Sequence, residues 1–123
     1  MIHTNLLIID DERRFTEFLV RRLNLRGITC CVRHEGQSAL DILRNKKFTL
    51  ILLDLQLPDI YGTEVLARIK SVGVTTPVVI LTGHGSEMDR QECMALGAHA
   101  FMHKPLDIDA LVRILDCIGG AAP

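Results

Sequence analysis

The feature that most constrains this chain is a hydrophobic run, Leu50–Leu53, that ends on one carboxylate, Asp54, and is followed by a loop containing Pro58. A strand buried on both faces has a nearly continuous hydrophobic sequence, and such strands are typical of parallel sheets covered by helices on both sides. In open sheets of this kind, ligands bind beyond the carboxyl ends of the strands. The run therefore predicts a central strand that presents Asp54 at the functional edge of a sheet.

Four other runs of strand length alternate with segments of helical periodicity. The further strands are expected at Leu6–Ile9, Ile28–Arg33, Pro77–Thr82 and Ala98–His103. The helices are expected at about Glu12–Arg26, from Gly36, from Gly62 to Gly73, after Ser86 to Leu96, and from Ile108 to Ile118. Five strands alternating with five helices predict a three-layer α/β sandwich with right-handed crossovers. Residues 1–118 form the predicted domain, and residues 119–123 are expected to be a flexible tail or the start of a linker.

Composition narrows the class of protein. The chain has 123 residues, which suits one domain, and its 48% hydrophobic and 24% charged residues are those of a globular protein. A formal net charge of -1 provides no overall field that would recruit nucleic acid or anionic lipid. The first residues include no basic region, and the apolar run after them ends at Asp10, so we expect neither a signal peptide nor a membrane span there. The four cysteines show no Cys-x-x-Cys spacing. We therefore expect a cytoplasmic protein with reduced thiols.

Unusual polar residues stand at four of the predicted strand ends. These residues are Asp10 and Asp11, Asp54, Thr82, and Lys104. If the strands are parallel, these side chains converge on one edge, where three carboxylates repel each other unless a cation lies between them. Mg²⁺ suits such a site, and a lysine and a hydroxyl suit a bound phosphoryl group. The set contains the parts that phosphoryl transfer to a carboxylate needs.

Together with Pro58, Gly62, Gly83 and Pro105, these residues form a pattern that resembles the receiver domain of two-component response regulators, in the CheY-like superfamily. The resemblance covers essentially the whole chain. It implies a flavodoxin-like sheet with strand order 2-1-3-4-5. It also implies a signalling switch that is not an enzyme, although it assists its own phosphorylation and dephosphorylation.

The resemblance implies a role for each matching residue. Asp54 would take a phosphoryl group from a histidine kinase and become an aspartyl phosphate. Asp11, Asp54 and the backbone carbonyl of Gln56 would ligate Mg²⁺, with Asp10 acting mainly through water. Lys104 would contact the phosphoryl group.

The resemblance also implies a switch. Thr82 would hydrogen-bond the phosphoryl group and Phe101 would be the switch aromatic, which we expect to point inward to an appreciable extent even without phosphate. Their movement would change the surface of the fourth helix, fifth strand and fifth helix. Lys104–Pro105 would be a cis peptide.

The implied partners are a histidine kinase or phosphotransfer protein and a downstream output domain or protein. Direct binding of nucleic acid or a membrane by this chain is not expected, and a homodimer formed on phosphorylation stays open. The chain is either a stand-alone receiver or part of a longer protein. Tyr61 departs from the family pattern, since it stands where the family often has a small polar residue. Gln56 and His84 lie two residues beyond Asp54 and Thr82, at positions that in this family border the path of the attacking water.

Each marker taken alone has a simpler interpretation. Asp10 and Asp11 also suit a helix N-terminus, Lys104 suits a solvated surface, and Phe101 suits a plain core. Three other functions share part of the pattern. A phosphatase of the haloacid-dehalogenase type would need an acid at Gln56, a flavodoxin would need a neutral phosphate loop after the first strand, and a degenerate receiver would act only as a scaffold.

Overall fold

The structure, a computed structural model, describes residues 4–119 and contains one parallel sheet with strand order β2-β1-β3-β4-β5. The strands are β1 (Asn5–Ile9), β2 (Thr29–Arg33), β3 (Leu50–Leu53), β4 (Val78–Thr82) and β5 (Ala100–His103). The helices are α1 (Arg13–Asn24), α2 (Gly36–Leu43), α3 (Gly62–Ser71), α4 (Glu87–Ala95) and α5 (Ile108–Gly119). The predicted five-stranded, flavodoxin-like α/β fold is confirmed.

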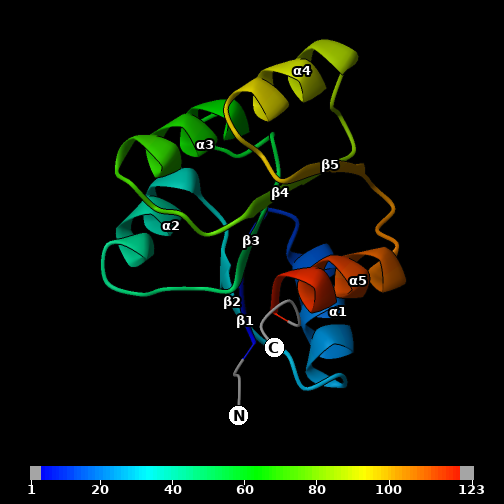
Figure 1. The fold of residues 1–123 in the computed structure, drawn as a ribbon. Coiled ribbons are helices and arrows are strands. Elements are labelled where there is room, and N and C mark those ends of the chain that lie inside the picture. Colours follow the sequence, from blue (N-terminus) through cyan, green and yellow to red (C-terminus); the bar gives the residue numbers. More distant parts are fainter. Residues whose placement is uncertain (1–3, 120–123) are drawn as a thin grey trace.

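Helices cover both faces of the sheet, with α2, α3 and α4 on one side and α1 and α5 on the other (Figure 1). The division follows from the alternation of side chains along each strand. In β1, Leu7 and Ile9 pack toward the first group of helices, whereas Leu6 and Ile8 pack toward the second. The sheet therefore lies between two hydrophobic layers.

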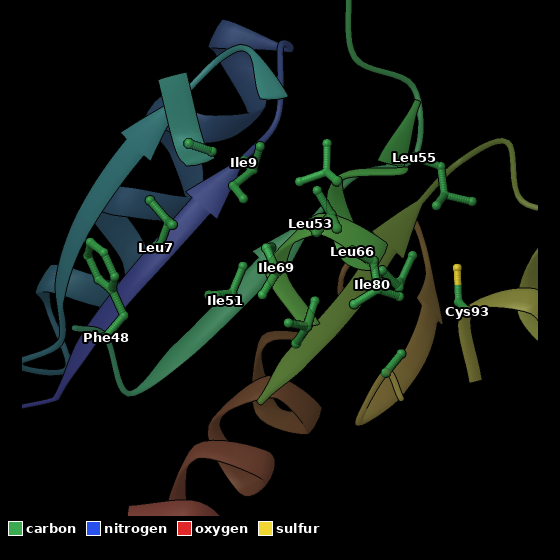
Figure 2. Close-up of a cluster of buried hydrophobic side chains, with 14 residues drawn as sticks. Leu7, Ile9, Phe48, Ile51, Leu53, Leu55, Leu66, Ile69, Ile80 and Cys93 are labelled. Atoms are coloured by element: carbon green, nitrogen blue, oxygen red, sulfur yellow. The ribbon is translucent and has the colours of Figure 1, made fainter. Parts of the chain in front are cut away.

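The strand before Asp54 is buried at every position, and all four of its side chains are at most 2% exposed. Figure 2 shows Ile51 and Leu53 of this strand beside Leu66 and Ile69 of α3. Full burial of one such side chain stabilises a fold by roughly 1.5–3 kcal/mol. This packing explains the continuous hydrophobic run and holds Asp54 on a rigid element.

Three helices are followed by a glycine in the left-handed region, where a side chain would be strained. Gly27, Gly73 and Gly97 have φ of 77°, 82° and 99° and follow α1, α3 and α4. The main differences from the sequence prediction are at element ends: α1 is shorter at both ends, and β5 begins at Ala100. Helix α5 includes Gly119, and the rest of the predicted tail, residues 120–123, lies outside the described residues.

Candidate functional site

Two buried carboxylates lie side by side at the carboxyl edge of the sheet. Asp10 directly follows β1 and Asp54 directly follows β3, and these two strands pair in parallel. Both residues are only 3% exposed. Because the strand register brings Ile9 opposite Leu53, the acids that follow them are brought together as the sequence predicts.

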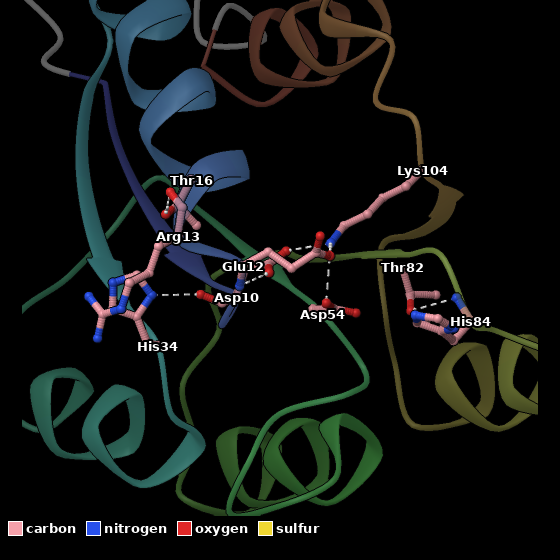
Figure 3. A network of polar contacts seen from close by, with 9 residues as sticks. All are labelled: Asp10, Glu12, Arg13, Thr16, His34, Asp54, Thr82, His84 and Lys104. Atoms are coloured by element: carbon pink, nitrogen blue, oxygen red, sulfur yellow. Dashed lines mark hydrogen bonds and ion pairs between the residues drawn. The ribbon is translucent and has the colours of Figure 1, made fainter.

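The ammonium of Lys104 reaches this pair from the end of β5 (Figure 3). Lys104 Nζ lies 2.9 Å from Asp10 Oδ2 and 3.3 Å from Asp54 Oδ2, and it also donates to the carboxylate of Glu12. The ring of Phe15 covers it, with Nζ 4.5 Å from the ring centroid. Since the lysine side chain is only 14% exposed, these ion pairs are screened less than surface pairs.

The carboxylates of Asp10, Glu12 and Asp54 form an acidic group in which one oxygen from each residue lies within 4.8 Å of the others. Asp54 Oδ1 is buried, and within residues 4–119 it has no hydrogen-bond partner. A buried polar atom without a partner is uncommon, and a hard divalent cation is the kind of group that satisfies a carboxylate oxygen. The residues present therefore fit a metal ion.

The acidic group contains one residue, Glu12, that the sequence did not predict as part of the metal site. Glu12, which is itself exposed, takes part in the group, whereas the exposed Asp11 lies outside it. The role expected for Gln56 belongs to its backbone carbonyl and stays a prediction. Glu12 comes close because its backbone amide donates to Asp10 Oδ1 (2.9 Å), which turns the chain at the start of α1. The sequence signal for Glu12 was its position at the end of the Asp10–Asp11–Glu12 run.

The charges of the site act on one another. Burial raises the pKa of the Asp10 carboxyl above its ordinary value, and the charge of Asp54 adds to this, although Lys104 acts in the opposite sense. Burial alone would lower the pKa of Lys104, but its contacts with Glu12 and Asp10 raise it well above its usual range. The lysine is therefore a permanent cation at neutral pH, held among carboxylates.

Thr82 is the last residue of β4, and Phe101 lies within the neighbouring strand β5, opposite Ile80. Thr82 is fully buried, and its Oγ1 accepts a hydrogen bond from the His84 amide (3.2 Å). A Cβ added at Gly85 would lie 2.5 Å from Phe101 Cζ and 2.8 Å from Thr82 Cγ2, so the phenyl ring and the threonine both contact the same glycine. The Lys104–Pro105 peptide is cis.

The loop that follows Asp54 turns back sharply beside it. The Gly62 amide donates to the Leu55 carbonyl (2.7 Å), and a Cβ on Gly62 would lie 2.6 Å from the Asp54 carbonyl oxygen. Two side chains of this loop reach other elements: Asp59 accepts from amides at the start of α2, and Tyr61 donates to Asp89. No signal in the sequence pointed to either of these contacts.

Known proteins similar to this chain include response regulators. The sequence model of the family named 'response regulator receiver domain' matches residues 6–116 of this chain. Over 113 residues the chain is 36% identical to the transcriptional regulatory protein CpxR of Escherichia coli, covering 92% of this chain and 48% of that protein. It is 32% identical to the uncharacterized transcriptional regulatory protein YkoG of Bacillus subtilis, covering 88% and 47%. The chain thus spans about half the length of these relatives.

A solved structure agrees with the sequence relatives. A response regulator from Burkholderia pseudomallei, with a phosphorylated aspartic acid, calcium ion and citrate, superposes with a TM-score of 0.84 at 28% identity. The match covers 91% of this chain and 66% of that one.

Among residues 4–119, none of the helices has the length and hydrophobicity that a membrane span requires.

Proposed function

This chain belongs to the response regulator receiver family, and we propose that Asp54 is the residue that accepts its phosphoryl group. A receiver is a phosphoacceptor signalling domain of a two-component system, not an enzyme, and its phosphorylation state acts as a switch. The observation that supports Asp54 concerns its two carboxylate oxygens. Oδ1 is buried and has no hydrogen-bond partner among the described residues, and Oδ2 accepts from Lys104. No other acid among residues 4–119 combines these two features at the end of the central strand.

The proposed reaction is a displacement at phosphorus. A carboxylate oxygen of Asp54 attacks the phosphorus of a phosphohistidine, a P–O bond forms as the P–N bond breaks, and the imidazole leaves with its electron pair. Lys104 stabilises the negative charge on the phosphoryl oxygens because it is a fixed cation within reach of Asp54. The buried Thr82 hydroxyl then donates to one of these oxygens.

Mg²⁺ is the proposed cation of the acidic group. It prefers sites that offer a small number of carboxylates, several water molecules and a phosphoryl oxygen. Its contribution is to neutralise charge on the carboxylates and the phosphoryl group. Asp11, Asp54 and the backbone carbonyl of Gln56 would hold it, with Asp10 acting mainly through water. The group around Asp10, Glu12 and Asp54 supports a cation at this edge, and Glu12 is a further candidate for an outer contact.

The proposed signal passes through Thr82 and Phe101 to the surface formed by α4, β5 and α5. A phosphoryl group brings roughly -1.5 to -2 charges, which attract the Thr82 hydroxyl toward Asp54. The contact of Thr82 and Phe101 with Gly85 supports this coupling, since movement of one changes the space open to the other.

The partners follow from the family. A receiver has a histidine kinase as its phosphodonor, and we propose that a phosphotransfer protein is an alternative donor. The output partner is a domain or protein that reads the α4, β5 and α5 surface, with a phosphorylation-dependent homodimer as one such case. We propose the cytoplasm as the location, because all four cysteines are free thiols.

Intact-mass measurement with acetyl phosphate and Mg²⁺ tests the assignment. The parent should gain one phosphate, and Asp54→Asn should gain none. Asp41→Asn, which changes an exposed acid on α2, is the matched control and should label like the parent. Labelling of Asp54→Asn at the parental rate would overturn the assignment, and an unlabelled parent would support the scaffold alternative.

A further inference from the structure

Tyr61 is the departure from the family pattern that the proposed function leaves unexplained. It occupies the N-cap position of α3, where a side-chain oxygen ordinarily accepts from a backbone amide. Its side chain makes no such capping bond in the part of the chain that the structure describes. Its hydroxyl instead donates to Asp89 Oδ1 (3.3 Å), and Asp89 belongs to α4. Tyr61 thus joins the loop after Asp54 to the helix that follows Thr82.

The carboxylate of Asp89 also holds the start of α4. Its Oδ2 accepts from the Ser86 amide and the Ser86 hydroxyl, both at 3.0 Å, and Ser86 Oγ accepts from the Asp89 amide at 3.1 Å. This reciprocal capping box fixes Asp89 relative to the first turn of α4. One carboxylate therefore connects Tyr61 to the N-terminus of α4 through its two oxygens.

The protonation states of Tyr61 and Asp89 at neutral pH favour the hydrogen bond between them. Burial raises the pKa of the Tyr61 phenol, and the neighbouring Asp89 carboxylate adds to this, so the phenol stays protonated at neutral pH. Hydrogen bonds from Ser86 lower the pKa of Asp89, so this group stays ionised. A charged acceptor strengthens the bond relative to a neutral one.

The connection lies beside the proposed switch. Only residues 83–86 separate Thr82 from α4, and Gly85 within them contacts both Thr82 and Phe101. A movement of Thr82 toward Asp54 would displace this short segment, and with it Ser86 and the start of α4. The bond between Tyr61 and Asp89 would oppose that displacement, because Tyr61 directly precedes Gly62, whose amide is held by the Leu55 carbonyl (2.7 Å).

We propose that Tyr61 is a positioning residue whose hydrogen bond to Asp89 holds α4 in its resting arrangement and thereby sets how readily phosphorylation moves this helix. The proposal rests on the proposed function, since it takes Asp54 as the phosphoacceptor. A bond made only in the resting state lowers the apparent affinity for any ligand that selects the active state. For one exposed hydrogen bond the effect is roughly two- to tenfold.

The chain offers its own probe, because Tyr61 is its single tyrosine and it has no tryptophan. Ultraviolet absorbance titration therefore reports on the Tyr61 phenol alone. Asp89→Ala should lower its pKa toward the ordinary value of about 10. Ser86→Ala, which also breaks the capping box but keeps the Asp89 carboxylate, is the control and should leave the pKa raised. An unchanged pKa in Asp89→Ala would overturn the contact.

The functional test uses beryllofluoride with Mg²⁺ as the phosphoryl mimic and amide spectra of α4 as the readout. Tyr61→Phe should bind the mimic roughly two to ten times more tightly than the parent. Glu64→Gln, which removes an exposed ion pair with Arg68 inside α3, should bind like the parent. In the Asp89→Ala background, Tyr61→Phe should have no further effect, because the bond is already absent.

The outcomes separate the two proposals. If the parent responds to beryllofluoride but Tyr61→Phe binds it equally or more weakly, the positioning role is wrong and Asp54 stays the phosphoacceptor. If the parent gives no response and no phosphate is added to Asp54, the proposed function fails and the role of Tyr61 fails with it.

Discussion

The carboxylate of Asp59 accepts a hydrogen bond from the backbone amide of Gly36 (2.8 Å), across 23 positions of the chain. Its second oxygen accepts from the Gln37 amide (2.9 Å). Glu35, the N-cap residue of α2, makes no side-chain capping bond within the described residues, so Asp59 caps this helix from the loop after Asp54. That loop is thus fastened to α2 through Asp59 and to α4 through Tyr61.

Asp59→Ala should destabilise the protein by about 1 kcal/mol, the usual cost of losing a capping side chain. The physical reason is that two amides at the start of α2 lose their acceptor. Urea unfolding at pH 7 measures the effect, and Asp41→Ala on the exposed face of α2 is the control. Equal stability of parent and Asp59→Ala would contradict the capping role.

The stability lost in Asp59→Ala should also depend on pH. Burial alone would raise the pKa of Asp59, but hydrogen bonds from the amides of Gln37 and Gly36 lower it below its ordinary value. Because the pKa of Asp59 is lower in the folded protein than in the unfolded chain, its ionised carboxylate stabilises the fold. This stabilisation is complete above the pKa of the unfolded chain, about 3.9, and is lost as the pH falls through the pKa of the folded protein. The stability difference between parent and Asp59→Ala should therefore shrink below about pH 4. A difference that stays constant to about pH 2 would argue against it.

Gly62→Ala should cost more than a capping variant, about 1–3 kcal/mol of stability or more. A Cβ there would lie 2.6 Å from both the Asp54 carbonyl oxygen and Leu55 Cα, and backbone atoms on a buried strand end cannot move aside easily. Gly83→Ala is the matched control, since its Cβ would come no closer than 3.9 Å to Lys104. Thermal unfolding of both variants measures the difference, and similar midpoints would show that the turn tolerates a side chain.

The sequence predicted the parts of this protein that depend on local pattern and strand order. The buried run at β3 predicted a central strand, and the parallel register of β1 and β3 then brought Asp10 and Asp54 together. Lys104 could be placed at the same edge because β5 ends there. Strand ends of a parallel sheet converge whatever the loops do, so this part of the site needed no knowledge of side-chain packing.

Contacts that depend on loop shape could not be predicted. Whether Glu12 or Asp11 turns toward Asp54 depends on the shape of the turn between β1 and α1, which has no regular repeat to fix side-chain directions. Asp59 and Tyr61 bond to elements 23 and 28 residues away, and nothing in their local sequence identifies those partners. Their positions follow from how α2, α3 and α4 pack on one face of the sheet.

Lys104→Met should tighten Mg²⁺ binding about tenfold and slow labelling by acetyl phosphate at least about tenfold. The ammonium lies 2.9 Å from Asp10 and 3.3 Å from Asp54, so it repels a cation that shares these carboxylates. Without the lysine, the metal meets less repulsion but the phosphoryl group loses a stabilising charge. Calorimetric titration with Mg²⁺ and a labelling time course measure the two effects.

Lys47→Met is the control for this variant, because Lys47 lies before β3 at the opposite edge of the sheet. It should leave both quantities unchanged. In EDTA, Lys104→Met should also unfold at a lower temperature than the parent, since three neighbouring carboxylates lack their cation, and added Mg²⁺ should restore much of the loss. Metal binding that weakens in Lys104→Met would contradict the competition.

Gly85→Ala should move the Phe101 ring outward and reduce the response of β5 and α5 to beryllofluoride. The added Cβ would lie 2.5 Å from Phe101 Cζ and 2.8 Å from Thr82 Cγ2, and the partly exposed ring is the group that can give way. Overpacking of this kind costs about 1–3 kcal/mol, and Phe101→Leu in the same chain should recover part of it because a smaller side chain fits beside the added methyl group. Side-chain spectra with and without the mimic measure the ring position. If the ring stays in place and the response is unchanged, the space beside Gly85 does not couple Thr82 to Phe101, and the signal must leave the site by another route.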